Sequence, residues 1–327
     1  MQVNDTAFLE RAAALAAPWM TFPNPRVGCV IVDADGLVVG EGAHHAAGEP
    51  HAEANALRMA GALARGATAY VTLEPHNHVG RTPPCSLALI EAGIARVVIA
   101  VAEPNPVAAG GADTMRAAGV AVDFVECPEA EAVNEHWLHA MRNARPFVTL
   151  KLATTLDGRV AAADGVETSI SNAASRRRVH ELRSRVDAVL VGAGTAVVDD
   201  PQLTVREAEC QRQPKRFVMG ERDLPGHLWM FTTGEAAEQL RTRDPRAALA
   251  ALHERQIRHL LIEGGPTVAR AFLEAGLVDE CIWVTAPKVF GAGPSAVGSP
   301  ALDAVSAWLR RDTADVEGDL WSYLRPA

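Results

Sequence analysis

Short apolar runs alternate with helical patterns along most of this 327-residue chain. Alternation of strands with helices of this length favours a layered α/β sheet. Residues 129–142 are predicted to form one closing helix, because their apolar side chains recur at helical spacing. The first half carries strand candidates at 27–32, 37–40, 69–73, 96–101 and 120–125, and helix candidates at 6–16, 52–64, 86–92 and 113–118.

Arg145-Pro146 marks the expected domain boundary, because a second α/β series begins directly after it. The length of the chain fits about two domains of ordinary size. We therefore expect domains at 1–145 and 146–327. Residues 207–250 are polar and Arg-rich, and their pattern predicts no function. The elements expected in the second series lie at 147–152, 173–185, 187–191, 258–262, 268–275 and 280–286.

The overall charge and the cysteines narrow the class of protein. A formal net charge of −9, from 31 basic and 40 acidic residues, argues against a nucleic-acid-binding surface. The N-terminus is polar, and no apolar run approaches membrane-spanning length. Five scattered cysteines fit a reducing compartment better than a disulfide framework, and Cys29 is expected in the core. We expect a cytoplasmic protein without nucleic-acid or membrane partners.

The segment His51-Ala52-Glu53, followed by a proline-bounded segment at 74–85, indicates metal-dependent deamination. A neutral imidazole binds zinc, while Glu53 can move protons beside the bound water without coordinating the metal. Cys85 follows two prolines and is expected to open a helix whose dipole favours the thiolate. His51, His76 and Cys85 would leave a fourth position for water, as a catalytic zinc site requires.

These motifs resemble a known family, the bifunctional deaminase/reductases of riboflavin biosynthesis. The deaminase half is matched by residues 23–28, 42–44, 50–53, 72–75, 80–85 and 103–106, and the reductase half by 151–159, 180–183, 187–195, 199–206 and 263–267. The resemblance implies a cytidine-deaminase-like α/β layered sheet followed by an α/β domain like dihydrofolate reductase. It also implies zinc-hydroxide deamination of a diaminopyrimidinone that carries a ribosylamino phosphate. The ribose is then reduced to ribitol with NADPH.

The resemblance assigns roles by position in the deaminase half. One zinc ion per chain is implied, and the whole protein is expected to form a homo-oligomer, a dimer through the reductase domain. Amide and imidazole groups suit a pyrimidine edge, and an arginine suits a phosphate. For each of these residues taken alone, capping of a loop is an equal alternative. The implied contacts to the first substrate are Asn24, His44, His78, Arg81 and Asn105.

Two glycine-rich turns support a dinucleotide site in the second half, because backbone N–H groups at such turns can approach phosphates. Pro266 lies where an anion-binding helix is expected to begin. The resemblance places Lys151 and Asp199 near the reacting carbon. It assigns NADPH to Ala153, Ser169, Thr195, Asp199, Gly265, Pro266 and Thr267, and the ribose phosphate substrate to Glu167, Arg183, Leu203, Arg206 and Glu263.

Three positions depart from the pattern of the family. His76 stands where it has cysteine, Glu167 where it has serine, and Ser169 where it has tryptophan. An imidazole in place of a thiolate makes the metal site more positive, so one alternative is a reductase with an impaired deaminase half. A non-catalytic binding or regulatory protein is a third possibility, which the presence of Glu53 and Lys151 argues against. The main hypothesis is a bifunctional enzyme with both steps active.

Overall fold

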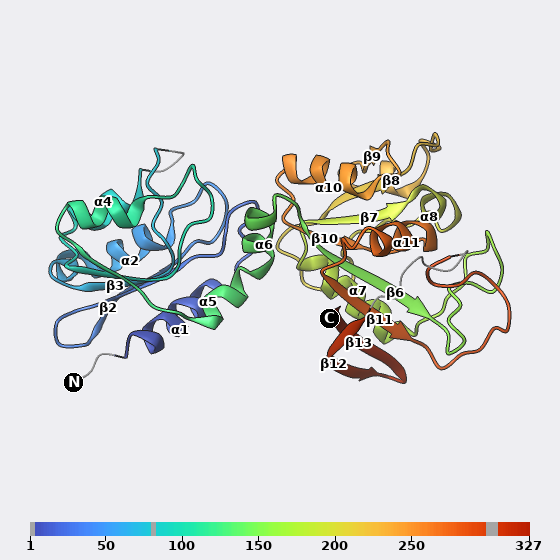
Figure 1. Ribbon diagram of the computed structural model, residues 1–327, viewed down its shortest axis with the longest axis horizontal. Coiled ribbons are helices and arrows are strands. Elements are labelled where there is room, and N and C mark those ends of the chain that lie inside the picture. Colours follow the sequence, from blue (N-terminus) through green and yellow to red (C-terminus); the bar gives the residue numbers. More distant parts are fainter. Residues whose placement is uncertain (1–3, 80–82, 299–306) are drawn as a thin grey trace. The chain divides into compact units, whose positions relative to one another are not determined.

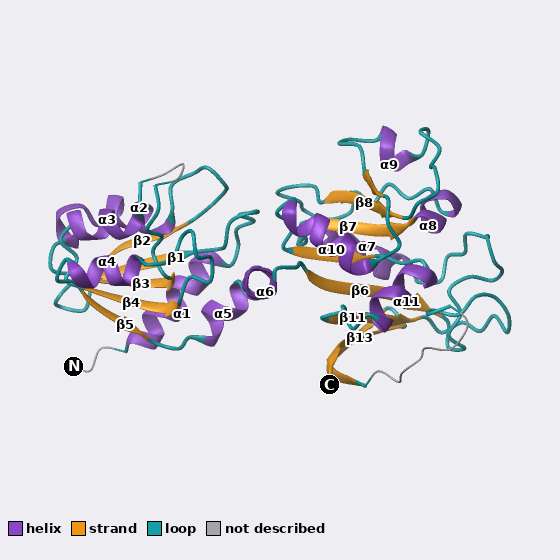
Figure 2. Ribbon diagram, turned by 45° about the horizontal axis from the view of Figure 1, so that its top comes forward, coloured by secondary structure: helices purple, strands orange, loops and turns teal. Residues whose placement is uncertain are grey.

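The computed structural model describes residues 4–79, 83–298 and 307–327. The chain forms two compact units, Met1–Arg142 and Asn143–Ala327. Each unit is built on one sheet with helices packed against it (Figures 1 and 2).

The first unit contains a five-stranded sheet with the order β2-β1-β3-β4-β5. Strand β1 pairs antiparallel with β2 and β3, whereas β3, β4 and β5 are parallel. The predicted strands are confirmed with small shifts at their ends. They are β1 (Gly28–Val32), β2 (Val38–Ala43), β3 (Thr68–Leu73), β4 (Arg96–Val101) and β5 (Ala121–Phe124).

Helices cover both faces of this sheet (Figure 1). Alternate residues of β1 divide between the faces: Cys29 and Ile31 pack in one core cluster, and Val30 and Val32 in the other. The first cluster includes residues of α2, α3 and α4, and the second includes residues of α1 and α5. Cys29 is fully buried, as expected. The helices are α1 (Asp5–Ala16), α2 (Ala52–Ala60), which continues as the 3₁₀ helix η1 (Gly61–Ala64), α3 (Cys85–Glu91), α4 (Gly111–Ala117), α5 (Pro128–Val133) and α6 (Glu135–Asn143).

A glycine in β2 lets α2 lie directly on the edge of the sheet. A Cβ atom at Gly42 would lie 2.2 Å from the carbonyl oxygen of Ala52, so no larger residue fits there. The helix begins after His51, its N-cap residue. The close approach thus places His51 and Glu53 at the edge of the sheet.

The prediction of one closing helix over 129–142 is wrong, because the segment forms α5 and α6 with a break at Asn134. The Asn134 side chain accepts a hydrogen bond from the backbone N–H of Arg26 at 2.8 Å. It also donates to the backbone carbonyl of Arg26 at 2.7 Å. These two hydrogen bonds join residues far apart in sequence, so helical spacing alone does not predict the break.

The second unit contains an eight-stranded sheet with the order β12-β13-β11-β6-β10-β7-β8-β9. The strands from β11 to β9 are parallel, and β13 pairs antiparallel with β11 and β12. The strands are β6 (Phe147–Thr154), β7 (Ala188–Gly192), β8 (Lys215–Met219), β9 (Glu238–Leu240), β10 (His259–Ile262), β11 (Glu280–Thr285), β12 (Trp308–Val316) and β13 (Asp319–Pro326).

Several of these elements have no counterpart among the predictions. The strands β8 and β9 lie in the polar segment 207–250, and most of the edge strand β12 is exposed. An edge strand and a three-residue strand carry too little apolar alternation to be recognised. The helices of this unit are α7 (Ala173–Ser184), α8 (Ala193–Val198), α9 (Trp229–Thr232), α10 (Pro245–Glu254) and α11 (Pro266–Glu274).

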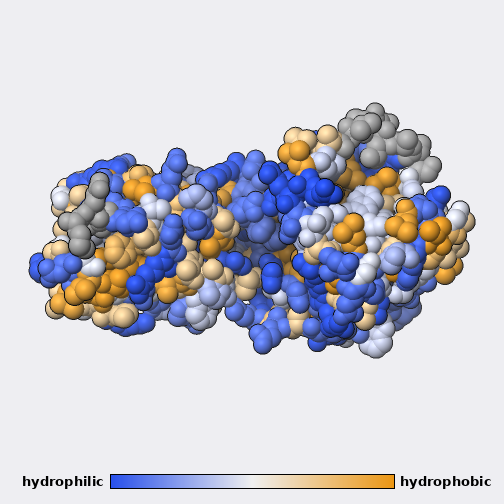
Figure 3. All heavy atoms as spheres, turned by 90° about the horizontal axis from the view of Figure 1, so that it is seen from below, coloured by the Kyte–Doolittle hydropathy of each residue, from blue (hydrophilic) through white to orange (hydrophobic). Residues whose placement is uncertain are grey.

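The surface drawn in Figure 3 intersperses hydrophilic residues with smaller groups of hydrophobic ones. Among the described residues, the helices are all too short or too polar to span a bilayer.

Candidate active sites

The structure brings the three predicted zinc ligands together at one end of the first sheet. His51 caps α2, Cys85 opens α3, and His76 lies in the segment that follows β3. One ligand atom of each residue lies within 4.8 Å of the others. His51 Nδ1 is 3.7 Å from Cys85 Sγ, and the rings of His51 and His76 are 4.6 Å apart.

The protonation states of these ligands follow from burial. Burial, together with the neighbouring imidazoles of His76, His44 and His78, lowers the pKa of His51 to about 4. His51 is therefore neutral at physiological pH, which is the form that binds metal. Burial and the Glu53 carboxylate raise the pKa of the Cys85 thiol and so oppose the thiolate that the helix dipole favours. A divalent cation between the ligands would supply the charge that stabilises the thiolate.

Glu53 is a buried carboxyl whose side chain interacts with Cys85, one of the three candidate ligands. Its side chain is 3% exposed, and its Oε2 atom has no hydrogen-bond partner among the described residues. Burial raises the pKa of this carboxyl above its ordinary value. Two imidazoles, one thiolate and an unpartnered buried carboxylate oxygen match the donor set of a catalytic zinc site.

Two predicted substrate contacts form a hydrogen-bonded pair next to this site. Asn24 Nδ2 donates to His44 Nε2 at 3.0 Å, and His44 Nδ1 donates to the carbonyl of Pro50 at 3.2 Å. This tautomer of His44 is assigned from its two hydrogen-bond partners, Asn24 and Pro50. The ring of His44 is 4.9 Å from that of His51, so the pair borders the metal ligands.

The other predicted contacts differ in what the structure shows. His78 lies 5.3 Å from His76 between ring centres, and its buried Nδ1 has no partner among the described residues. Asn105 Oδ1 accepts from the backbone N–H of Val107 at 3.1 Å, so its oxygen caps the loop. Arg81 lies outside the described residues.

Three polar residues that were not predicted from the sequence hold the segment that carries His76. Ser86 Oγ donates to the carbonyl of His76 at 3.3 Å and to Asn77 Oδ1 at 2.8 Å. Glu74 accepts two backbone hydrogen bonds through its buried carboxylate. The signal was available, because polar residues that directly follow a buried strand and flank a metal ligand need partners of their own.

In the second unit, the two glycine-rich turns meet. Gly192 N donates to the carbonyl of Gly264 at 3.4 Å. Gly265 has φ +84°, and a Cβ atom there would approach Thr195 Oγ1 to 2.9 Å. Pro266 and Thr267 then open α11. Four residues predicted to bind NADPH are thereby gathered at the carboxyl ends of β7 and β10.

A charged cluster joins β6, α7 and the residue that directly follows β10. Arg183 binds Glu263 through two hydrogen bonds, Nε to Oε1 at 2.5 Å and Nη2 to Oε2 at 2.7 Å. Burial opposes ionisation of Glu263, but Arg183 lowers its pKa overall. Burial also lowers the pKa of Lys151, and the charge of Glu263 opposes that change. The Arg183 guanidinium, which was predicted to bind the phosphorylated substrate, thus donates two of its hydrogen bonds to the Glu263 carboxylate.

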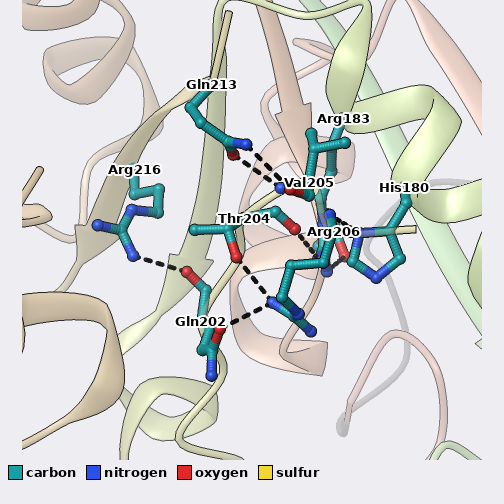
Figure 4. A network of polar contacts seen from close by, with 9 residues as sticks. His180, Arg183, Gln202, Thr204, Val205, Arg206, Gln213 and Arg216 are labelled. Atoms are coloured by element: carbon teal, nitrogen blue, oxygen red, sulfur yellow. Dashed lines mark hydrogen bonds and ion pairs between the residues drawn. The ribbon is translucent and has the colours of Figure 1, made fainter. Parts of the chain in front are cut away.

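Figure 4 shows loop 202–206 fastened by side chains from the surrounding elements. Arg206 Nη1 donates to Thr204 Oγ1 at 2.7 Å, and Gln213 pairs with both backbone polar groups of Val205. The guanidinium of Arg206 remains exposed and can meet an anion. Further contacts to the loop come from Arg183, His180 and Arg216.

The other residues predicted to bind substrate or cofactor in the reductase half lie in different surroundings. The Leu203 side chain is 2% exposed in the core, so only its backbone can contact a ligand. Burial, and then the charge of Glu167, raise the pKa of Asp199. The carbonyl of Ser169 accepts from Lys288 Nζ at 3.0 Å. Ala153 is half-buried on β6.

Comparisons with known proteins agree with this division. Residues 2–101 match the cytidine and deoxycytidylate deaminase zinc-binding region, and residues 146–317 match the RibD C-terminal domain. The chain is 44% identical to the riboflavin biosynthesis protein RibD of Mycobacterium tuberculosis, with 91% of this chain and 88% of the relative covered. It is 43% identical to the RibD of Escherichia coli, with 89% of this chain and 89% of that relative covered.

Solved structures of similar proteins cover nearly the whole chain. Acinetobacter baumannii RibD is 37% identical with a TM-score of 0.91, and 99% of each chain is covered. A diaminohydroxyphosphoribosylaminopyrimidine deaminase/5-amino-6-(5-phosphoribosylamino)uracil reductase from Thermotoga maritima is 34% identical with a TM-score of 0.85 and the same coverage.

Proposed function

Because this chain belongs to the RibD family of riboflavin biosynthesis proteins, we propose which of its residues carry each of the two reactions. The chain is a zinc-dependent pyrimidine deaminase joined to an NADPH-dependent reductase. Its substrates are those named for the Thermotoga maritima relative, a phosphoribosylaminopyrimidine and the uracil that follows from it. We place the domain boundary between residues 145 and 146, where the match to the C-terminal domain begins.

The observation that carries the deaminase assignment is the unpartnered Oε2 of Glu53 beside three convergent ligands. His51, His76 and Cys85 would hold a zinc ion, which would supply Lewis-acid activation of water. Glu53 accepts one proton of the attacking water at Oε2 and passes it to a pyrimidine ring nitrogen. It then takes the second proton of that water, from the hydroxyl now bonded to the ring carbon, and gives it to the amino group, which leaves as ammonia. The Asn24–His44 pair holds the pyrimidine edge, and His78 and Asn105 contact the same substrate. Arg81, outside the described residues, is proposed for the phosphate on the chemistry of its guanidinium alone.

In the reductase half, the paired glycine turns would hold NADPH along Thr195 and Gly265–Thr267, with Ala153 and Ser169 completing the site. The cofactor would supply the hydride, and the protein supplies alignment and a polar environment. Lys151 donates a proton to the ribose oxygen, and Asp199 orients the reacting carbon. Arg183 and Glu263 frame the substrate as a pair, and Arg206 with the Leu203 backbone reaches the phosphate. Glu167 borders this site.

His76 in place of cysteine does not favour an impaired deaminase. Its imidazole meets the other two ligands within the same 4.8 Å cluster, and neutral nitrogen is an ordinary zinc donor. A purely binding or regulatory role would leave the buried Glu53 and the Lys151–Glu263–Arg183 cluster without a purpose.

Metal analysis with assays of both reactions tests this assignment. Full-length protein purified with zinc present should hold about one zinc per chain and should turn over both substrates. His76→Cys should retain zinc at least as well against a chelator, since thiolate is the stronger ligand. Protein that stays zinc-free in these conditions would overturn the deaminase assignment and leave the reductase assignment standing.

We also propose a homodimer formed through the reductase domain and a cytoplasmic location. The exposed edge strand β12 supports the first, because unpaired backbone groups at a sheet edge can pair with a second copy. The five cysteines, all free, support a reducing compartment. Sedimentation of the full-length protein would decide the first proposal, and cell fractionation the second.

A further inference from the structure

Glu74 lies between β3 and the segment that carries His76, and both of its carboxylate oxygens accept backbone hydrogen bonds. Oε1 accepts from the N–H of Ala112, at the start of α4, at 2.9 Å. Oε2 accepts from the N–H of Glu103 at 3.1 Å. The backbone N–H of Glu74 itself donates to Val101 O at 2.9 Å, and the residue is 8% exposed. One buried side chain thus fastens both ends of the loop that contains Asn105.

Two further contacts hold this loop against the ligand segment. Asn77 N donates to the carbonyl of Ala108 at 2.9 Å. A Cβ atom at Gly111 would lie 1.9 Å from the carbonyl oxygen of Pro75, so the backbones touch there. The segment with His76 and the loop with Asn105 are therefore packed without a gap, and Glu74 supplies the charged hydrogen bonds between them.

We infer that Glu74 is a positioning residue for deamination. Its carboxylate sets the distance between the Asn105 loop, one wall of the pyrimidine site, and the segment that carries His76 and His78. This inference rests on the proposed function, because Asn105 matters only if it contacts the substrate. A carboxylate is required there because two N–H donors point at it, and an amide would offer one acceptor only.

Glu103 provides a matched control in the same loop. Its Oε1 accepts from the N–H of Asn105 at 2.8 Å, and its other oxygen has no hydrogen-bond donor among the described residues. Glutamine at this position keeps the single acceptor that is used. The two substitutions Glu74→Gln and Glu103→Gln are therefore chemically identical, but only the first removes a hydrogen bond.

Zinc binding should not depend on Glu74. His51 and Cys85 belong to helices α2 and α3, and the carbonyl of His76 is held by Ser86. Loss of the Glu74 carboxylate should thus loosen the substrate wall and leave the metal in place.

The test compares the wild-type full-length protein with Glu74→Gln and Glu103→Gln. We expect Glu74→Gln to keep one zinc per chain and to raise the KM of deamination about tenfold or more, with kcat changed much less. A contact remote from the reacting carbon contributes equally to ground and transition states, which is why KM should carry the effect. Hydrogen exchange at the amides of Glu103 and Ala112 should accelerate. Glu103→Gln should leave zinc content, KM and kcat unchanged and should not accelerate the exchange of either amide.

Reductase turnover on pre-deaminated substrate reports whether each variant is folded. If Glu74→Gln does not fold, hydrogen exchange of the wild-type protein tests the inference instead. The amides of Glu103 and Ala112 should then be protected from exchange and should lose this protection together. Unprotected amides, equal effects of both variants, loss of zinc from Glu74→Gln, or an unchanged KM would each overturn the inference. A zinc-loaded wild-type protein that does not deaminate would instead refute the proposed function, while the exchange data would still show whether Glu74 fastens the loop.

Discussion

The two active sites differ in how their buried charges are compensated. In the deaminase half, Glu53 and Cys85 are buried acids whose pKa values are raised by burial. No basic side chain in the described part of the chain offsets this rise. In the reductase half, Arg183 and Glu263 already form a two-pronged ion pair with Lys151 nearby. The first arrangement suits a site completed by a cation. In the second arrangement the charged side chains are already paired with each other before a phosphorylated substrate binds.

The largest expected effect isolates the deaminase site. Glu53→Gln should keep zinc bound and slow deamination by about 10²–10⁴-fold, because the amide cannot carry protons. Reduction of pre-deaminated substrate should be unchanged. Measured rates for the two steps, taken on one preparation, check this. A parallel fall of both activities would show that the two sites are not separate.

The reductase frame should respond in stability as well as in activity. Arg183→Ala leaves the buried Glu263 carboxylate without the partner that hydrogen-bonds both of its oxygens, although Lys151 remains nearby, and should lower the free energy of unfolding by about 3 kcal/mol. Urea unfolding of the second unit, followed by its tryptophan fluorescence, measures this. Arg206→Ala is the matched control: its guanidinium is exposed, so it should leave stability within about 1 kcal/mol and mainly raise KM. Similar losses for both variants would contradict the assignment of Arg183 to a buried pair.

Burial of Glu103 close to the Glu74 carboxylate should give the deaminase half a pH-dependent stability. Burial, and then the charge of Glu74, raise the pKa of Glu103 from 4.5 to about 7. Folding therefore favours the protonated carboxyl, and stability falls as the pH rises from 4.5 to about 7. Glu103→Gln removes this loss. It should stabilise the first unit by about 1 kcal/mol at pH values above 7 and have no effect in acid, because water screens part of the repulsion at a half-buried site. Urea unfolding at both pH values measures the difference, and an equal gain at both would exclude the carboxyl pair as its cause.

The smallest effect concerns Glu167, whose charge raises the pKa of Asp199. Glu167→Ser should lower the KM for the phosphorylated substrate a few-fold by relieving repulsion, with kcat nearly unchanged. Steady-state kinetics at low and physiological salt check this, since screening should shrink the difference. An unchanged KM at low salt would mean that Glu167 does not face the substrate.

The sequence by itself determined the parts of this protein that local patterns encode. The strand predicted at 96–101 matches β4 residue for residue, because a buried parallel strand is a short apolar run. The candidate ligands His51, His76 and Cys85, which the structure brings together, were identifiable because short stretches next to strand ends and helix starts carry them. The two glycine-rich turns were recognisable for the same reason.

Only the tertiary structure decided which side chains bind each other. Arg183 and Glu263 were both assigned to the substrate, and their mutual pairing joins residues 80 positions apart. Asn134 breaks a helix because its amide finds Arg26, and Glu74 spans two loops that no local pattern connects. Leu203 turns its side chain into the core with φ +57°, a conformation that its surroundings impose. Periodicity reports which face of an element is buried, whereas these contacts depend on where distant segments meet once the sheets have formed.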